Sequence, residues 1–284
     1  MRILLLLSLF LGLLAVIPAQ AQKKKKRLNQ TIENIIRKYK ALNAKAAYVK
    51  ANGVPVAKAT RFIQPEDKLV PDYSQLHQIA LVRHGEPDLV KTGKFSYREA
   101  RKFLLNYDSV GIIVPDKPFF HIKAPDQVAI FTSSINRAQA TAKYLFGDSA
   151  QMTVSPDFRE FETNVGRHYL KLRMPIKLWT TSARIKWMLG IDSHGIESFA
   201  AARKRARKAA VLLAKATEEK PKVILVAHGF LNRYIKEDLQ KLGWQVVRDG
   251  GSNYFATTIL VKIEDKKEQK EHNISLGSTS EGSR

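Results

Sequence analysis

Short apolar segments alternate with amphipathic segments over most of the chain. Runs of roughly four to eight branched apolar residues predict buried strands, whereas apolar residues spaced at about three or four positions predict helices. Strands that alternate with helices predict a mostly parallel α/β sheet covered on both faces. The expected strands are 78–83, 127–133, 152–156, 222–229 and 254–263, and the expected helices are 97–106, 135–147, 197–216 and 230–242.

The two ends of the chain depart from this alternation. Residues 3–18 form an apolar run without a charge, and Ala19 and Ala21 follow it as the small residues of a cleavage site. This pattern predicts a signal peptide that is cleaved after Ala21, and therefore export to the periplasm or the exterior. An uncleaved membrane anchor is the less favoured alternative, because the run is shorter than the ~20 residues of a typical span.

These patterns divide the chain into four parts. Residues 1–21 are the expected signal peptide, and residues 22–76 form a basic arm that is expected to be irregular over 44–75. Residues 77–263 hold the α/β domain. Residues 264–284 are charged and then rich in serine and glycine, a composition typical of a disordered tail.

Composition constrains the ligand more than the fold. The chain carries 48 Lys and Arg residues against 26 Asp and Glu residues, a net charge of +22, which favours anionic ligands. The block Lys23–Arg27 is expected to contact an anionic membrane surface only weakly. The basic run 203–208 is typical of a solvated helix face, so nucleic acid is not an expected partner. No cysteine is present, so export adds no disulfide bonds.

Polar side chains follow three of the expected strands at the point where each strand ends. Arg83 and His84 follow the first strand, Arg137 follows the second in the first turn of a helix, and His228 ends the fourth. Ligands of parallel α/β sheets bind beyond the carboxyl ends of strands. We therefore expect these four residues to form a cationic cup, and a phosphoryl group suits such a cup.

His84 is the natural nucleophile of this cup. A neutral imidazole is available near neutral pH without a metal or a cofactor, and it can attack phosphorus to give a phosphohistidine. The two arginines and His228 would hold the remaining oxygens as charge shifts. A carboxylic acid nearby would protonate the leaving group and then activate water.

Five motifs appear together in a recognisable order. They are "LVRHGEP" at 81–87, "SSINRAQATA" at 133–142, "FREF" at 158–161, "GIESF" at 195–199 and "VAHG" at 226–229. In this order they resemble the histidine phosphatase superfamily, in its phosphoglycerate-mutase-like branch (branch 1). The resemblance covers about residues 77–263. It implies a three-layer α/β/α sandwich with a mostly parallel central sheet and a phosphohistidine mechanism.

The resemblance also implies roles for particular residues. It makes His84 the nucleophile, Arg83, Arg137 and His228 the phosphate ligands, and Glu160 the proton donor. The spacing after Glu160 is longer than the common form, so Glu162 stays open as an alternative acid.

One departure from the family pattern bears on the reaction. Where mutases of the family carry a hydroxyl and an amide after the nucleophile, this chain has Pro87 and Val90. We therefore expect an exported, metal-independent phosphatase of the histidine acid type that hydrolyses a small anionic phosphomonoester. A phosphomutase or phosphotransferase and a non-catalytic phosphate- or polyanion-binding module are the alternatives. The sequence predicts neither the substrate nor the oligomeric state.

The segment 170–190 has two interpretations. Its tryptophans, methionines and basic residues fit a helical cap over the site that sets leaving-group preference. They also fit an ordinary packing helix, which is the commoner case and the one we favour.

Overall fold

The computed structural model describes most of the predicted α/β domain and a few short stretches before it. The expected signal peptide, the block Lys23–Arg27 and the expected tail lie outside the described residues. Among the described residues, no helix is long and apolar enough to cross a membrane. The described residues are 30, 32–38, 40–41, 48–51, 54–57, 63, 76–115, 125–162, 164–165, 172–191 and 195–263.

A six-stranded sheet forms the centre of the molecule. Its order is β6-β5-β8-β3-β10-β9, and the first four strands pair in parallel, whereas β10 runs antiparallel to both of its neighbours. The strand predictions are confirmed to within a few residues, but β9, an edge strand of four residues, was not expected. The bounds are β3 (His77–Arg83), β5 (Val128–Ser133), β6 (Met152–Ser155), β8 (Lys222–Ala227), β9 (Gln245–Arg248) and β10 (Thr257–Lys262).

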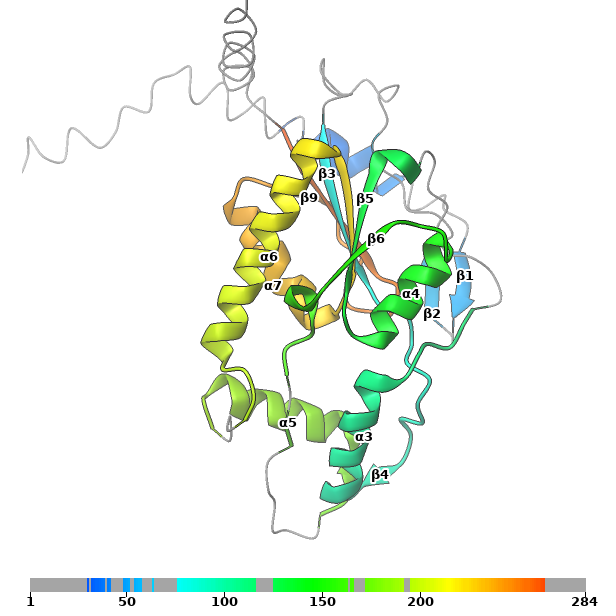
Figure 1. Cartoon of the computed structure of the whole chain (residues 1–284), viewed down its shortest axis with the longest axis vertical. Coiled ribbons are helices and arrows are strands. Elements are labelled where there is room, and N and C mark those ends of the chain that lie inside the picture. Colours follow the sequence, from blue (N-terminus) through cyan, green and yellow to red (C-terminus); the bar gives the residue numbers. More distant parts are fainter. Residues whose placement is uncertain are drawn as a thin grey trace, which may run out of the picture.

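Helices cover both faces of this sheet (Figure 1). Along β3, Ala80 and Val82 pack in one apolar cluster with α4 (Asn136–Phe146), because successive side chains of a strand point to opposite faces. Ile79 and Leu81 pack in the other cluster with α6 (Phe199–Glu219) and α7 (Gly229–Lys241). The expected three-layer α/β/α sandwich with a mostly parallel sheet is therefore confirmed.

The described part of the N-terminal arm packs against this domain. Ile35, in a helical stretch over 32–38, is fully buried in the same cluster as Ala80. The Gln78 side chain exchanges two hydrogen bonds with the backbone of Ile63, at 2.9 and 3.1 Å.

The expectation that 44–75 is irregular is wrong for two short strands. β1 (Tyr48–Ala51) and β2 (Val54–Ala57) pair as an antiparallel hairpin in which Ala51 faces Val54. The two residues between these strands are Asn52 and Gly53, a sequence that favours the tight turns of hairpins. This local signal outweighed the scattered glycine and proline on which the expectation rested.

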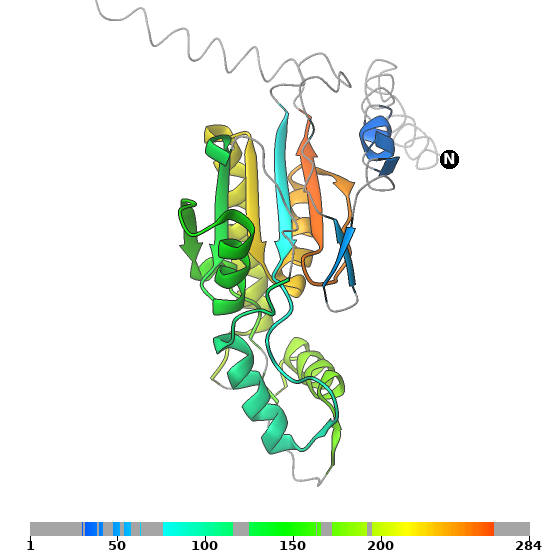
Figure 2. The same cartoon turned by 90° about the vertical axis from the view of Figure 1, so that its right-hand side faces the viewer.

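A smaller lobe lies beyond the carboxyl ends of the parallel strands (Figures 1 and 2). It contains α3 (Tyr97–Ser109), α5 (Ile176–Met188) and a two-stranded ribbon of β4 (Lys94–Phe95) and β7 (Met174–Pro175). Phe103 of α3 and Trp179 of α5 belong to a separate apolar cluster that joins the two helices. The lobe thus covers the edge of the sheet where the predicted site lies.

Candidate active site

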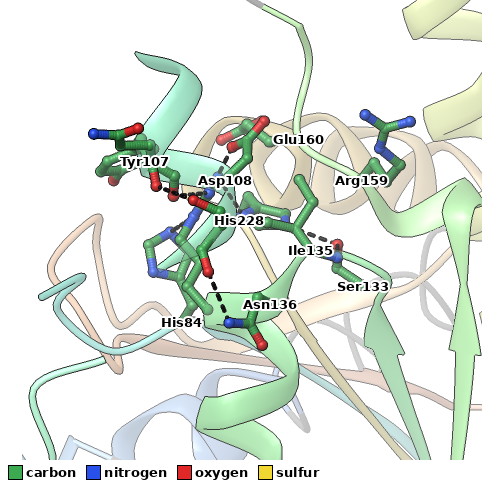
Figure 3. Close-up of polar contacts among 12 residues, drawn as sticks. His84, Tyr107, Asp108, Ser133, Ile135, Asn136, Arg159, Glu160 and His228 are labelled. Atoms are coloured by element: carbon green, nitrogen blue, oxygen red, sulfur yellow. Dashed lines mark hydrogen bonds and ion pairs between the residues drawn. The ribbon is translucent and has the colours of Figure 1, made fainter. Parts of the chain in front are cut away.

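The structure brings the four predicted cup residues together. Arg83 ends β3, Arg137 lies in the first turn of α4, and His228 is the residue before α7. His84, Arg137 and His228 are each at most 2% exposed. The Arg137 guanidinium joins the two histidines: its Nε lies 3.2 Å from His84 Nε2 and its Nη2 lies 3.3 Å from His228 Nδ1 (Figure 3). We call Arg83, His84, Arg137 and His228 the phosphate cup.

The surroundings of His84 keep its ring neutral. Burial, followed by the positive charges of Arg137 and Arg83, holds the pKa of His84 well below its usual 6.5. The Nδ1 atom lies 2.7 Å from the Gly85 carbonyl oxygen, which can only accept, so Nδ1 carries the proton. The lone pair then lies on Nε2, the atom that faces Arg137 and the interior of the cup.

His228 is also held neutral and oriented. Burial and the charge of Arg137 keep the pKa of His228 well below its usual value. Because a guanidinium can only donate, His228 Nδ1 accepts from Arg137, and its Nε2 donates to Ser133 Oγ at 2.9 Å. Ser133, from the motif at the end of β5, therefore acts on the cup by fixing the His228 ring.

The two glycines of the histidine motifs allow close packing around the cup. A Cβ at Gly85 would lie 2.5 Å from the ring of Phe255, and a Cβ at Gly229 would lie 3.2 Å from Arg83. Neither glycine is among the residues with positive φ. These two glycines therefore serve close packing, and neither position needs the left-handed conformation that favours glycine.

Arg83 closes one side of the cup. Its guanidinium carbon lies 4.4 Å from the centre of the Tyr254 ring, and Nη1 donates to the carbonyl oxygen of Ser252. Its Nε is buried and has no hydrogen-bond partner among the residues that the structure describes. A buried donor without an acceptor raises the free energy of the folded protein, and an oxygen of an anion bound in the cup would supply that acceptor.

Sequence reasoning missed a pair of residues on α3 that contact Arg137. Arg137 Nη1 donates to the Tyr107 carbonyl oxygen at 2.7 Å and to Asp108 Oδ1 at 2.6 Å (Figure 3). The Tyr107 ring lies 4.3 Å from the same guanidinium, and burial raises the pKa of its hydroxyl to about 12. One signal was available: Asp108 lies in the last turn of its helix, where the helix dipole disfavours an acidic side chain.

The two candidate acids have different surroundings. Glu160 accepts hydrogen bonds from the backbone N–H groups of Phe230, at 3.3 Å, and Leu231, at 3.1 Å, at the start of α7. Its carboxylate is thus tied to the helix that begins directly after His228. Glu162 instead accepts from the Glu197 N–H at 2.9 Å. Both line the cavity, but only the Glu160 carboxylate is bonded to the helix of the cup.

Arg205 holds the segment that carries Glu160. From α6, Arg205 Nη1 donates to the carbonyl oxygens of Asp157, at 3.0 Å, and of Arg159, at 2.7 Å. Its Nη2 forms an ion pair with Glu197 Oε2 at 2.7 Å. The basic run 203–208 was expected to be a solvated face. That expectation is wrong for Arg205, because its side chain is only 16% exposed and serves as a brace.

The cup opens into a cavity of about 840 Å³ between the sheet edge and the smaller lobe. The lining includes the cup residues Arg83, His84 and Arg137, Glu160 and Glu162, and Lys177, Thr180 and Arg184 of α5. The helix of this segment, α5, therefore packs in the lobe as favoured and also lines the cavity. A role of the segment in leaving-group preference stays a prediction. Within the described part of the chain, no group of three or more His, Asp or Glu side chains is arranged to hold a metal ion.

The match of this chain to a family model shows which protein family it belongs to. The model of the histidine phosphatase superfamily (branch 1) matches residues 79–275, a span that contains all five motifs. The chain belongs to this superfamily. Its cup residues are thus found on a fold and in a motif order that the superfamily shares. No curated protein matches the sequence significantly.

Solved structures of hydrolases resemble this superfamily member at low identity. Mycobacterial hydrolase 2 is 22% identical, with a TM-score of 0.39, over 67% of this chain and 84% of its own. A mycobacterial glucosyl-3-phosphoglycerate phosphatase is 21% identical, with a TM-score of 0.38, and the match covers 66% of this chain and 90% of that phosphatase. A phosphoserine phosphatase from Entamoeba histolytica is 17% identical, with a TM-score of 0.37, and the match covers 64% of this chain and 89% of that phosphatase. Because these values are low, the family follows from the family model and the fold from the topology described above.

Proposed function

We propose that this protein hydrolyses a phosphomonoester through a phosphohistidine intermediate on His84. The observation that carries the proposal is the state of the His84 ring: neutral, with Nδ1 held by the Gly85 carbonyl and the Nε2 lone pair directed at the Arg137 guanidinium. A nucleophile placed against a cation that can grip a phosphoryl oxygen is the arrangement that phosphoryl transfer needs.

In the first step, the lone pair of His84 Nε2 leaves its hydrogen bond with Arg137 Nε and attacks phosphorus, and the bond from phosphorus to the leaving oxygen breaks. Arg83 and Arg137 hold the non-bridging oxygens, where charge develops. The neutral His228 has no free N–H for a phosphoryl oxygen, and it contributes by accepting from Arg137 Nη2 and so orienting the guanidinium. Glu160, next to the start of α7, gives its proton to the leaving oxygen, so the product departs as an alcohol.

In the second step, water replaces the alcohol. The Glu160 carboxylate takes a proton from the water while the oxygen attacks phosphorus and the phosphorus–nitrogen bond breaks. Inorganic phosphate leaves, and both His84 and Glu160 return to their starting protonation states. The cycle balances without a metal ion or a redox partner.

The positions that depart from the mutase pattern support hydrolysis over transfer to a second substrate. Val90 is 75% exposed, and neither Pro87 nor Val90 is among the described residues that line the cavity. A mutase must hold its acceptor close to the phosphohistidine, and these positions offer no polar group for that purpose.

The test is hydrolysis of 4-nitrophenyl phosphate with and without a chelator, using wild-type protein and the His84→Ala variant. We expect turnover by the wild type in both conditions, a trapped acid-labile phosphoenzyme, and loss of both signals in His84→Ala. Arg207→Ala, on the exposed side of α6, is the control. Turnover that survives His84→Ala would refute the nucleophile, and phosphate binding without any phosphoenzyme would favour a non-catalytic binding module.

Export is a second part of the proposal. It is supported by the apolar run 3–18 and by the small residues before a cleavage site at Ala21. The block Lys23–Arg27 would then begin just after the new N-terminus, where weak contact with an anionic membrane surface is favourable. N-terminal sequencing of protein from its native host is the test, and a sequence that starts at Met1 would contradict cleavage.

A further inference from the structure

The cavity is larger and more basic than a single phosphoryl group requires. Its volume of about 840 Å³ is typical of sites for whole small molecules, whereas the phosphate cup occupies only its inner end. Beyond the cup, most of the cations on its wall face a carboxylate. For example, Lys91 Nζ lies 2.8 Å from Glu86 Oε1, and Lys236 Nζ lies 3.0 Å from Asp249 Oδ2.

Arg184 of α5 is the exception that matters most. Its guanidinium lies over the ring of Phe230, with 4.3 Å from the guanidinium carbon to the ring centre. Its Nη1 is buried and has no hydrogen-bond partner, and no ion pair involves Arg184 among the described residues. A buried, charged donor without a partner is unfavourable unless a ligand supplies the acceptor.

Two more polar side chains lie on the same face of α5. Lys177, Thr180 and Arg184 are spaced three and four residues apart, so they share one side of the helix, and all three line the cavity. The other side is apolar and buried through Trp179 and Ala183. Within the described chain, Lys177 also has no carboxylate partner. We call Lys177, Thr180 and Arg184 the outer wall.

The outer wall lies on the leaving-group side of the cup. Phe230, on which Arg184 is stacked, donates its backbone N–H to the Glu160 carboxylate. Glu160 is the group that protonates the leaving oxygen under the proposed function. Glu160 and Arg184 thus share Phe230 as a neighbour and line the same cavity, so the group bonded to the leaving oxygen has Arg184 on the wall beside it.

We infer that the outer wall is a second anion site, and that the substrate is a phosphomonoester whose leaving group carries a carboxylate or a second phosphate. The inference rests on the proposed function for the position of the leaving group. Arg184 forms the charged hydrogen bonds to the second anion and Lys177 adds positive charge. Thr180 lines the site between them, with its hydroxyl donating to the Lys177 carbonyl oxygen at 3.1 Å.

The experiment uses ω-carboxyalkyl phosphates with two to five methylenes, each compared with its neutral carboxamide. The members of a pair differ in charge but hardly in shape or in the leaving oxygen. At the best chain length we expect wild-type kcat/KM to be about 10- to 100-fold higher for the carboxylate. The corresponding α,ω-alkanediol bisphosphates, compared with the monophosphates, tell whether the site prefers phosphate to carboxylate.

The Arg184→Gln variant tests the residue directly. We expect the preference for the charged member to fall to within about threefold of unity, with Arg184→Lys intermediate, and Arg207→Gln to keep the full preference. Binding of the same pairs to His84→Ala, followed by calorimetry, should show the same dependence on Arg184 without turnover. If every pair is turned over equally, or if Arg184→Gln keeps the preference, the second anion site is wrong although the phosphatase stands. If no ester is hydrolysed, the proposed function fails, and the calorimetry alone decides the site.

Discussion

The phosphate cup and the outer wall hold their charged groups in opposite ways. In the cup, Arg137 donates to both histidines, to Asp108 and to a backbone carbonyl, so its guanidinium is fixed before any ligand arrives. On the outer wall, Arg184 is stacked on one ring, and its buried Nη1 has no hydrogen-bond partner within the described part of the chain. A site that stabilises a transition state benefits from donors that are already oriented. On the outer wall, by contrast, a donor of Arg184 is left for a bound ligand to pair with. Such an arrangement suits recognition of the substrate more than stabilisation of the transition state.

The largest effect should come from loosening the cup. In Arg137→Lys, a single ammonium cannot reach both histidines and the phosphoryl oxygens at once, because it lacks the planar fork of the guanidinium. We expect kcat/KM for 4-nitrophenyl phosphate to fall about 1,000-fold, with the fall mainly in kcat. Arg207→Lys on α6 is the matched control. A loss confined to KM would mean that Arg137 binds the ground state as well as the transition state and that the contrast with the wall is weaker than described.

The next largest effect should separate the two candidate acids. Glu160→Gln keeps an acceptor for the Phe230 and Leu231 N–H groups but cannot donate a proton as an acid. We expect kcat for an alkyl phosphate to fall about 100-fold, and kcat for 4-nitrophenyl phosphate to fall much less because its leaving group needs little protonation. Glu162→Gln should change either value less than about threefold. The reverse ranking would move the acid role to Glu162.

The cup was predictable from sequence because its residues stand in short motifs at the ends of apolar strands. Arg83, His84 and His228 follow runs whose burial is evident from composition, and parallel strands bring their carboxyl ends to one edge. Arg137 was found through its place at the start of a helix. Each of these positions depends on local sequence and on a topology that the alternation of elements already fixes.

The outer wall and the contacts of Arg137 with α3 were not predictable in the same way. Asp108 and Arg184 come from helices whose packing depends on the cluster around Phe103 and Trp179, far apart in the chain. Which face of α5 turns to the cavity is a result of that packing, and the sequence alone left the segment 170–190 open between cap and packing helix. Arg205 was misjudged for the same reason: its basic neighbours suggested solvent, and only the fold brings the carbonyl groups of Asp157 and Arg159 to it.

Asp108 offers a smaller test at the boundary between cup and lobe. Its carboxylate lies 2.6 Å from Arg137 Nη1, where it opposes the approach of a dianion to the cup. Arg137 remains held by the Tyr107 carbonyl and by both histidines without it. We therefore expect Asp108→Asn to lower the inhibition constant of inorganic phosphate by about three- to tenfold, a modest change because the carboxylate is 55% exposed and screened. A higher inhibition constant would instead make Asp108 a positioning residue for Arg137.

The smallest effect is on stability, and it belongs to the cup alone. Burial and the neighbouring arginines lower the pKa of His84 and of His228 below the ordinary value of 6.5, so both rings are neutral in the folded protein. In the unfolded chain each ring gains a proton as the pH falls below about 6.5. The unfolded state then binds more protons, and the free energy of unfolding falls with decreasing pH by up to ~1.4 kcal/mol per pH unit for each histidine.

This contribution is complete above about pH 6.5 and is lost progressively as the pH falls toward the lowered pKa values. Thermal unfolding between pH 7.5 and 5 should therefore show a steeper fall in Tm for the wild type than for the double variant His84→Gln/His228→Gln. Arg184→Gln should keep the wild-type slope, because a guanidinium on the outer wall does not titrate in this range. Equal slopes in the wild type and the double variant would show that folding does not lower the pKa of the two rings, and the account of how the cup keeps His84 neutral would then fail.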